Sequence, residues 1–243
     1  MSDRFTVSTD GPVAHVRLCC GDDGNTLASP DMRAIGKAIR DAGSDASVKL
    51  VVITGDGVDF CLGRRSAQGA PKPKDARDFR ERVTDAILSV YENVAKTPVP
   101  VLTAVQGRAR GFGCAFVAGT DITVAERTAK FSLPEMDGDL PPTLAISACM
   151  RRMPHKAVLD MVLTRDEIDA DTAYMFGLAS RVVEAGKLAD GVAYYEAKIG
   201  DRDRNALIAV KEYLRLAPHM DDAGAARYAA NLLATERSSP AGN

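Results

Sequence analysis

The fold of this chain is decided by the stretch Pro98-Val-Pro-Val-Leu-Thr-Ala-Val-Gln-Gly-Arg-Ala-Arg-Gly-Phe-Gly-Cys-Ala-Phe-Val-Ala-Gly-Thr-Asp121. Its first part, Val99 to Val105, is apolar and rich in β-branched residues, which predicts a buried strand. Gly107, Gly111 and Gly113 then predict a tight turn, and the small apolar residues after them predict a buried helix. Backbone N–H groups left unpaired at such a helix start can hold an anion or a developing oxyanion. The alternative is a purely structural turn packed closely on a sheet.

The chain before this stretch contains further predicted strands. Phe5 to Cys20 alternates apolar and polar residues around a Gly-Pro pair, which predicts a β-hairpin. Val48 to Thr54 predicts a second buried strand. Phe60-Cys61-Leu62 predicts a short strand that runs into a turn at Gly63. This turn is a second place where backbone amides can face a ligand.

Two helices are predicted in the same region. With Ser29 as N-cap and Pro30 at the first helical position, a helix is expected to continue to about Asp41. Asp75 to Lys96 carries its apolar residues on one face and predicts a long amphipathic helix. Between these helices, Gln68 to Lys74 predicts an exposed polar loop.

After the central stretch, the pattern changes from alternating strands and helices to helices alone. Short strands are predicted at Ile122–Ala125, Lys130–Ser132 and Ser180–Val183. From Lys187 onward the chain is predicted to be helical, and Ser238–Asn243 is predicted to be a disordered tail. The fold class is therefore α/β with a helical appendage. The helices expected between these strands run over Thr143–Met153, with Thr143 as cap, Pro154–Leu163 and Asp166–Phe176.

Composition limits the classes of function. The chain has 243 residues, 46% of them hydrophobic, which suits one large domain or one domain with an appendage. A net charge of -2, with basic residues spread along the chain, indicates neither a nucleic-acid nor a membrane partner. No apolar run reaches the about 18 residues of a membrane span, and the N-terminus lacks a signal-type segment. Five cysteines without metal-ligand spacing predict buried thiols in a reducing compartment, hence a cytoplasmic protein without a metal.

Four segments, in this order, resemble the crotonase superfamily, the enoyl-CoA hydratase/isomerase enzymes. They are Asn25-Thr26-Leu27, Phe60-Cys61-Leu62-Gly63, Ala104 to Asp121, and Phe131 to Glu135. The resemblance covers nearly the whole chain, and the glycine-rich segment is the most similar to the family's signature. It implies a crotonase-like ββα spiral core in residues 1–185. It also implies a C-terminal helical region, residues 186–243, that packs subunits into trimers or hexamers.

The resemblance also implies which residues form the site. Enzymes of this family bind a coenzyme A thioester and hold its carbonyl oxygen with two backbone N–H groups, here those of Arg64 and Phe112. Such donors stabilise a developing enolate, and one of them is worth about 3 kcal/mol of barrier. No cofactor beyond the CoA moiety of the substrate is expected. The residues expected to bind that moiety are Leu27, Leu62, Gly63, Arg64 and Gly111.

The acidic residues depart from the hydratase pattern. Hydratases of this family carry two glutamates, and Ala115 stands where the first would be. Glu135, at the position of the second, is present. Hydration is most simply done with two carboxylates, whereas one suffices to move a proton between two substrate carbons. The pattern therefore favours an enoyl-CoA isomerase with Glu135 as proton shuttle. A purely structural Glu135 is the alternative.

Other charged residues leave further reactions open. Asp137 and Asp139 either enter the site or cap the helix at Thr143 and face water. Arg65 and Arg110 lie next to the two amides in sequence. Either arginine can receive a substrate carboxylate, as in a decarboxylase or hydrolase, bind the CoA pyrophosphate, or pair with Asp137 or Asp139. The histidines are not expected to be catalytic: His15, His155 and His219.

Two other functions compete with the isomerase. One is an enoyl-CoA hydratase, or a related acyl-CoA hydrolase or decarboxylase, that recruits those charged residues. The other is a family member without activity that binds acyl-CoA or serves as an oligomeric partner, which Ala115 and the short C-terminus motivate. The apolar faces of the last helices need a partner, which favours an oligomer. Those faces carry Ala206, Val210, Leu214, Ala226, Ala230 and Leu233.

Overall fold

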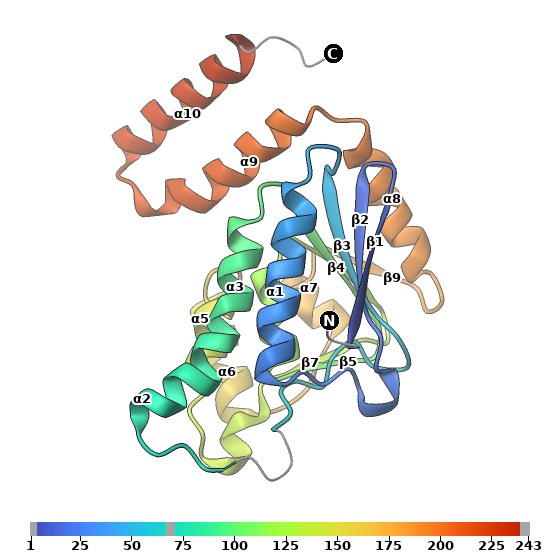
Figure 1. The fold of residues 1–243 in the computed structure, drawn as a ribbon, viewed down its shortest axis with the longest axis vertical. Coiled ribbons are helices and arrows are strands. Elements are labelled where there is room, and N and C mark those ends of the chain that lie inside the picture. Colours follow the sequence, from blue (N-terminus) through green and yellow to red (C-terminus); the bar gives the residue numbers. More distant parts are fainter. Residues whose placement is uncertain (1–3, 67–70, 239–243) are drawn as a thin grey trace.

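The structure, a computed structural model, describes residues 4–66 and 71–238 (Figure 1). Its larger sheet has six strands in the order β1-β2-β3-β4-β6-β9. The predicted hairpin is confirmed, because β1 and β2 pair antiparallel, and all other neighbours in this sheet are parallel. The strands are β1 Phe5–Asp10, β2 Val13–Leu18, β3 Leu50–Gly55, β4 Val101–Val105, β6 Ile122–Glu126 and β9 Arg181–Val183.

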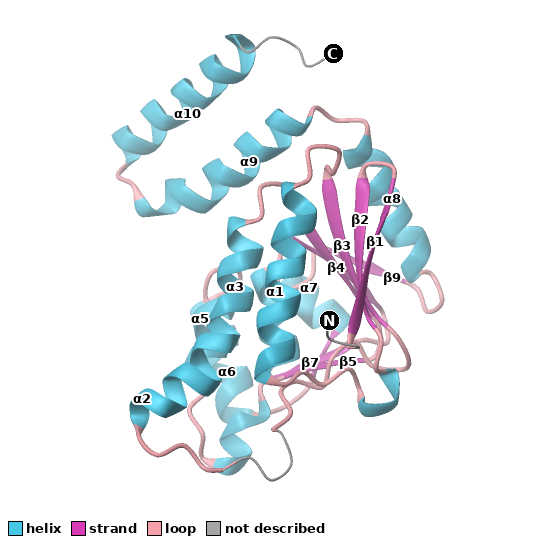
Figure 2. Ribbon diagram, viewed as in Figure 1, coloured by secondary structure: helices cyan, strands magenta, loops and turns pink. Residues whose placement is uncertain are grey.

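Helices cover both faces of this sheet, which explains why its central strands are apolar throughout. Figure 2 shows α1 (Ser29–Ser44) and α3 (Asp85–Lys96) on one side of the sheet and α8 (Leu188–Gly200) on the other. All five residues of β4 are buried between these layers. The predicted α/β class is thereby confirmed, and the glycine-rich turn follows a strand that is held on both sides.

A second, smaller sheet was not predicted. It has the order β5-β7-β8, with β5 Arg108–Arg110, β7 Lys130–Ser132 and β8 Ile168–Asp169. Gly107, at φ +55°, turns the chain out of β4 into β5, and a β-carbon there would lie 2.0 Å from the Val58 carbonyl oxygen. The region of the glycine-rich turn therefore contains a strand of its own before the helix starts.

The strand predicted at Phe60–Leu62 is wrong as a regular element. Cys61 makes only an isolated bridge with Ala109 of β5. Its N–H donates to the Arg108 carbonyl at 3.2 Å, and its carbonyl accepts from the Arg110 N–H at 3.0 Å. These two bonds nevertheless fasten the segment before Gly63 to the strand before Gly111.

The predicted helices before the glycine-rich turn exist, with corrections at their ends. Ala28, not Ser29, is the N-cap of α1, and Asp31 Oδ2 accepts from the Ala28 N–H at 2.9 Å. The helix predicted over Asp75–Lys96 is one helical stretch of α2 (Ala76–Phe79), a π-helical turn (Arg80–Thr84) and α3. Part of the predicted loop Gln68–Lys74 lies outside the described residues.

Some of the helices predicted after the glycine-rich turn have different ends in the structure. The helix α4 spans Phe112–Gly119 and is buried, as predicted. The helix predicted to reach Met153 ends at Cys149, and its N-cap is Pro142 rather than Thr143. The helix predicted from Asp166 starts later, because Ile168–Asp169 pairs as β8 and the Asp169 carboxylate then caps the next helix. These helices are α5 Thr143–Cys149, α6 His155–Thr164 and α7 Ala170–Met175.

The C-terminal part of the chain is helical, as predicted. After α8 come α9 (Arg204–Leu216) and α10 (Asp222–Ser238), which lie beyond one end of the sheet in Figure 1. Residues 239–243 of the predicted tail lie outside the described residues. No helix in the described part is long and apolar enough to cross a membrane.

Candidate active site

The first segment of the site is held by a buried asparagine. Asn25 adopts a left-handed backbone conformation at φ +54°. Its amide donates to the carbonyls of Asp56 at 2.8 Å and Asp59 at 2.9 Å, and its Oδ1 accepts from the Cys20 N–H at 3.0 Å. These bonds fix the loop before Leu27 against the loop before Phe60, so the two loops reach the site as one unit.

Arg64 is placed by a parallel bridge to Leu27. The Leu27 N–H donates to the Gly63 carbonyl at 3.1 Å, and the Arg65 N–H donates to the Leu27 carbonyl at 3.0 Å. In such a bridge, the residue between the two bonds directs its own N–H away from the partner strand. Among the described residues the Arg64 N–H has no hydrogen-bond acceptor. It is thus free to receive an acceptor from a ligand.

Phe112 begins α4 directly after the turn at Gly111. Gly111, at φ +56°, donates to the Ser132 carbonyl at 2.8 Å, so the turn is fixed to β7. A first-turn N–H has no acceptor inside its own helix, and none of the described residues accepts from Phe112. A β-carbon on Gly63 would lie 2.9 Å from the Arg110 carbonyl oxygen and 3.7 Å from the Phe112 nitrogen. The predicted residues on the two glycine turns therefore lie side by side.

Glu135 lies against the second turn. It belongs to a 3₁₀ helix, Pro134–Gly138, that follows β7. A β-carbon on Gly111 would lie 2.9 Å from Glu135 Oε1, so a side chain at position 111 would displace the carboxylate from its present place. Glu135 Oε2 is buried and has no hydrogen-bond partner among the described residues. Burial raises the pKa of Glu135, and a backbone hydrogen bond and the nearby Arg110 oppose this shift only in part. A carboxyl group with these properties suits proton transfer.

Ala115 and Tyr91 complete the surroundings of the turn. Ala115 is fully buried on α4. The Tyr91 ring, from α3, stacks on the Phe112 ring with 6.3 Å between centroids and 14° between planes. From the sequence alone, Tyr91 is one of the residues on the apolar face of the helix predicted over Asp75–Lys96. A tyrosine in an otherwise aliphatic stripe is the signal that marks it, because its hydroxyl needs a polar environment.

Two of the four charged residues that neighbour the site in sequence, Asp137 and Arg65, form ion pairs with other residues. Asp137 forms an ion pair with Arg165, with 3.0 Å between Oδ1 and Nε, and so does not cap α5. Asp139 is exposed in a left-handed conformation at φ +52°. Arg65 pairs with Asp31 at 3.3 Å rather than with either of them. Arg110 is exposed next to the turn, with no ion-pair partner among the described residues.

The other candidate side chains do not join the site. His15 lies 3.8 Å from Glu196, and His155 and His219 are exposed at helix ends. Cys61, Cys114 and Cys149 are buried, as expected for most of the cysteines. Within residues 4–66 and 71–238, no three His, Cys, Asp or Glu side chains gather as a metal site.

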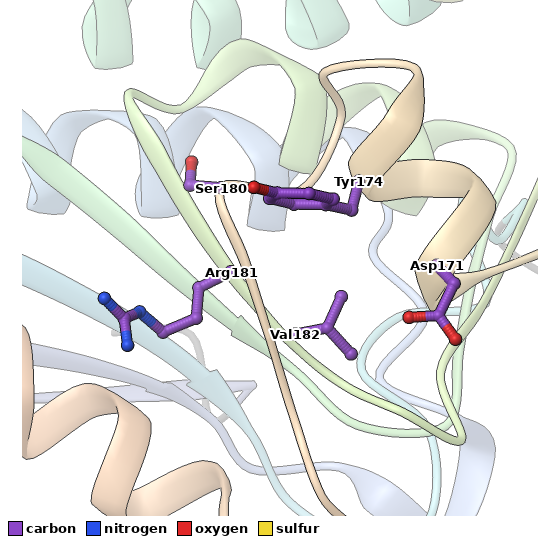
Figure 3. A pocket seen from close by; sticks show the side chains of 5 residues that line it. All are labelled: Asp171, Tyr174, Ser180, Arg181 and Val182. Carbon is purple, nitrogen blue, oxygen red and sulfur yellow. The ribbon is translucent and has the colours of Figure 1, made fainter.

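A separate hollow lies at the β9 edge of the large sheet (Figure 3). It measures about 310 Å³ and is lined by Asp171, Tyr174, Ser180, Arg181 and Val182. Its charged groups already have partners: Asp171 pairs with Arg127, and the Arg181 guanidinium lies 4.1 Å from the Tyr194 ring centroid. None of the predicted site residues lines it.

The raised pKa of Glu135 predicts a gain in stability when the charge of this carboxylate is removed. Because burial raises its pKa in the folded protein, ionised Glu135 disfavours folding. That cost is absent below the carboxyl's ordinary pKa of about 4.5 and grows as pH rises through the higher folded value. Glu135→Gln is therefore expected to raise the free energy of unfolding at neutral pH, with a gain that shrinks as pH falls. Urea unfolding between about pH 5 and 8 measures this. A variant less stable than the wild type at the upper pH contradicts it.

Several curated proteins are similar to this chain in sequence. A probable enoyl-CoA hydratase of Rhizobium meliloti is 29% identical over 86% of this chain and 80% of its own length. A probable enoyl-CoA hydratase of Mycobacterium leprae is 31% identical over 77% and 72%. The human mitochondrial enoyl-CoA hydratase domain-containing protein 3 is 27% identical over 74% of this chain, which spans 59% of that protein.

The fold of this chain also resembles solved structures of enoyl-CoA hydratases. The enoyl-CoA hydratase of Mycobacterium smegmatis has a TM-score of 0.91 at 26% identity, covering 98% of this chain and 93% of that one. The crotonase-like fold expected from the sequence is thereby confirmed. The sequence model of the family described as enoyl-CoA hydratase/isomerase matches residues 9–238. Since that match spans nearly the whole chain, the protein belongs to the enoyl-CoA hydratase/isomerase family.

Proposed function

We propose that this protein is an acyl-CoA-processing enzyme that isomerises the double bond of an enoyl-CoA. The observation that carries the proposal is the half-buried Glu135, whose buried Oε2 has no hydrogen-bond partner among the described residues. It lies against the glycine turn from which the Phe112 amide is directed. Burying a carboxylate oxygen without a hydrogen bond costs stability, and such a cost is typical of a catalytic group.

The two free amides supply the other half of the chemistry. The thioester carbonyl oxygen of the substrate accepts from the Arg64 and Phe112 N–H groups, which hold the negative charge of an enolate. Phe112 also contributes the positive end of α4. Leu27, Leu62, Gly63, Arg64 and Gly111, which form or adjoin the two turns, are proposed to contact the CoA thioester.

In the proposed reaction, a single proton moves between two carbons of a 3-enoyl-CoA. Glu135 Oε2 takes the proton from C2, and the electron pair of that bond passes into the carbonyl held by the amides. The enolate then re-forms the carbonyl, the double bond moves to C2–C3, and the C4 carbon takes the proton back from Glu135. The carboxylate is regenerated, so one acid is enough.

Replacing the acid Glu135 tests the proposal directly. With a 3-enoyl-CoA, the wild type is expected to form the conjugated 2-enoyl thioester, followed by absorbance. Glu135→Gln is expected to lower that rate by about 10²- to 10⁴-fold, the usual contribution of a positioned acid–base group. The matched control is Glu167→Gln, because Glu167 is exposed and lies outside the site.

The contrary outcomes separate the competing functions. No signal from a wild type that binds CoA thioesters tightly contradicts isomerisation of that substrate. Full isomerase activity of Glu135→Gln excludes Glu135 as the shuttle and assigns the proton transfer to another group. Binding without turnover or exchange of the C2 proton favours an inactive acyl-CoA-binding protein. The hydratase alternative is supported by the names of the relatives.

The C-terminal helices support an oligomer, proposed as a homotrimer or hexamer with residues 186–243 as the contact region. An apolar groove between α9 and α10 exposes Val210 at 60%, Leu214 at 66% and Leu233 at 66%. Ala226 and Ala230 do not line this groove; Ala229 and Leu232 do. A molar mass of one chain, 25.9 kDa, in solution at micromolar concentration contradicts the proposal.

A further inference from the structure

Arg110 is a cation beside the proposed site that has no ion-pair partner in the described part of the chain. It is the last residue of β5 and is exposed, while its neighbour Ala109 is buried. Arg108 lies two residues earlier, on the same face of the strand, and pairs with the Asp59 carboxylate at 2.8 Å. The fold therefore uses the first arginine of this short strand and leaves the second without a counter-ion.

Acidic residues follow β7, the strand that pairs with β5, yet Arg110 forms an ion pair with none of them. In this pairing Arg110 lies opposite Ser132. The acids come three, five and seven residues after that serine: Glu135, Asp137 and Asp139. Asp137 pairs with Arg165 instead, and Asp139 is exposed. The guanidinium of Arg110 is thus available to an anion that the chain itself does not supply.

The backbone of Arg110 belongs to both glycine turns of the site. Its N–H donates to the Cys61 carbonyl at 3.0 Å, in the segment that leads to the first turn. A β-carbon on Gly63 would lie 2.9 Å from the Arg110 carbonyl oxygen. The next residue, Gly111, forms the second turn. Arg110 is therefore held where the two segments that carry the proposed oxyanion amides meet.

The charge of Arg110 also reaches Glu135. Burial is the largest influence on the pKa of Glu135 and raises it, whereas a backbone hydrogen bond and the Arg110 charge lower it. Attraction between charges near the surface is largely screened beyond about 10 Å. The guanidinium therefore lies near the carbons on which Glu135 is proposed to act. The phosphates of CoA are separated from those carbons by the whole pantetheine arm, so an anion next to Arg110 belongs to the acyl group.

We propose that Arg110 selects acyl groups that carry a second carboxylate, so that the preferred substrates are mono-CoA thioesters of dicarboxylic acids. A guanidinium binds a carboxylate through two parallel N–H bonds, which gives both energy and orientation. A neutral acyl chain offers no such acceptor. The inference rests on the proposed function for the positions of the thioester and of Glu135, and it deepens that function by naming the substrate class. Arg110 determines specificity and takes no part in the proton transfer.

Saturated thioesters measure this preference without turnover. Calorimetric titration compares hexanoyl-CoA with adipoyl-CoA, and octanoyl-CoA with suberoyl-CoA, pairs in which a carboxylate replaces the terminal methyl group. In at least one pair the wild type is expected to bind the dicarboxylic thioester about 10- to 100-fold more tightly, the effect of charge-assisted hydrogen bonds. Arg110→Gln is expected to lower this ratio to about one or below, and Arg110→Lys to retain part of it.

The matched control is Arg40→Gln, which is expected to leave the ratio of affinities unchanged. Arg40 is exposed on α1 and, within residues 4–66 and 71–238, also has no ion-pair partner. Turnover gives a second readout. The ratio of kcat/KM for 3-hexenedioyl-CoA to that for 3-hexenoyl-CoA is expected to fall in Arg110→Gln by about the factor seen in binding, mainly through KM.

The outcomes separate this inference from the proposed function. A wild type that isomerises enoyl thioesters but binds both members of every pair equally overturns the inference alone. A dicarboxylate preference that depends on Arg110, in a protein that isomerises neither hexenoyl thioester, supports the inference and overturns the isomerase. Equal weakening of both members of a pair in Arg110→Gln assigns Arg110 to the CoA moiety or to Glu135 and overturns the inference. A wild type that binds none of these thioesters overturns both.

Discussion

Replacing Gly113 by alanine is expected to lower turnover by about a hundredfold or more, the effect of losing one oxyanion donor. The reason is a backbone clash. A β-carbon at this position would lie 2.1 Å from the Cys61 carbonyl oxygen, which already accepts from the Arg110 N–H. The two segments must therefore move apart, and they carry the Arg64 and Phe112 amides. If these amides are the proposed oxyanion donors, a shift of either by a fraction of an ångström misplaces it relative to the thioester oxygen of the substrate.

The measurement compares turnover and thermal stability for three glycine variants. Gly138→Ala is the control, because nothing lies within 4 Å of a β-carbon there. Gly63→Ala is a second variant for the case that Gly113→Ala fails to fold, since its β-carbon would meet the Arg110 oxygen at 2.9 Å at φ +106°. A folded Gly113→Ala or Gly63→Ala enzyme with wild-type turnover would show that the spacing of the two turns does not matter for the reaction.

Local sequence signals predicted the elements whose causes are local. The strand over Val101–Val105, the helix at Phe112 and the hairpin at Gly11 follow from apolar runs, alternation and turn residues. The strand Arg108–Arg110 was missed because it is three residues long and exists only through pairing with β7. A second pairing, of β7 with β8, shortened the helix predicted from Asp166. Tertiary pairing overrides local pattern at such sites.

The candidate site likewise has features that the sequence predicts and features that depend on tertiary packing. Glycines in the sequence indicated the tight turns at positions 63, 107 and 111, because only glycine readily adopts the positive φ values found there. The motif identified Glu135 as a candidate. It could not indicate that Oε2 lacks a hydrogen-bond partner, because this is a property of packing. The partner of Asp137 is Arg165, on the loop after α6, and no pattern in the sequence links them. Tyr91 reaches the turn only through the contact between α3 and α4.

A buried lysine ties the C-terminal helices to the core that holds the site. Lys211 of α9 is 8% exposed, and its Nζ lies 2.7 Å from Asp121 Oδ2. It also donates to the carbonyls of Val94 at 3.1 Å and Val99 at 3.0 Å, at the end of α3 and the approach to β4. Burial lowers the pKa of Lys211, while Asp121 opposes this shift. All the acceptors belong to elements that lead into or out of the glycine-rich turn.

Lys211→Met is expected to lower the free energy of unfolding by about 3 kcal/mol, because removing one partner leaves Asp121 an incompletely compensated charge. Asp121 keeps the Val101 N–H at 2.9 Å and Arg152 at 3.7 Å, which limits the loss. At this chain length the change corresponds to a fall in Tm of about 10 °C.

Urea and thermal unfolding of the variant measure this loss, and Lys156→Met, an exposed lysine on α6, is expected to stay within about 0.5 kcal/mol of the wild type. Asp121→Asn is expected to destabilise as well, since it leaves the ammonium group short of its strongest partner. The double variant is expected to lose less than the sum of the two, because neither charge then remains without its partner. Additive losses, or a Lys211→Met protein as stable as the wild type, would show that the helices are held to the core by apolar packing alone.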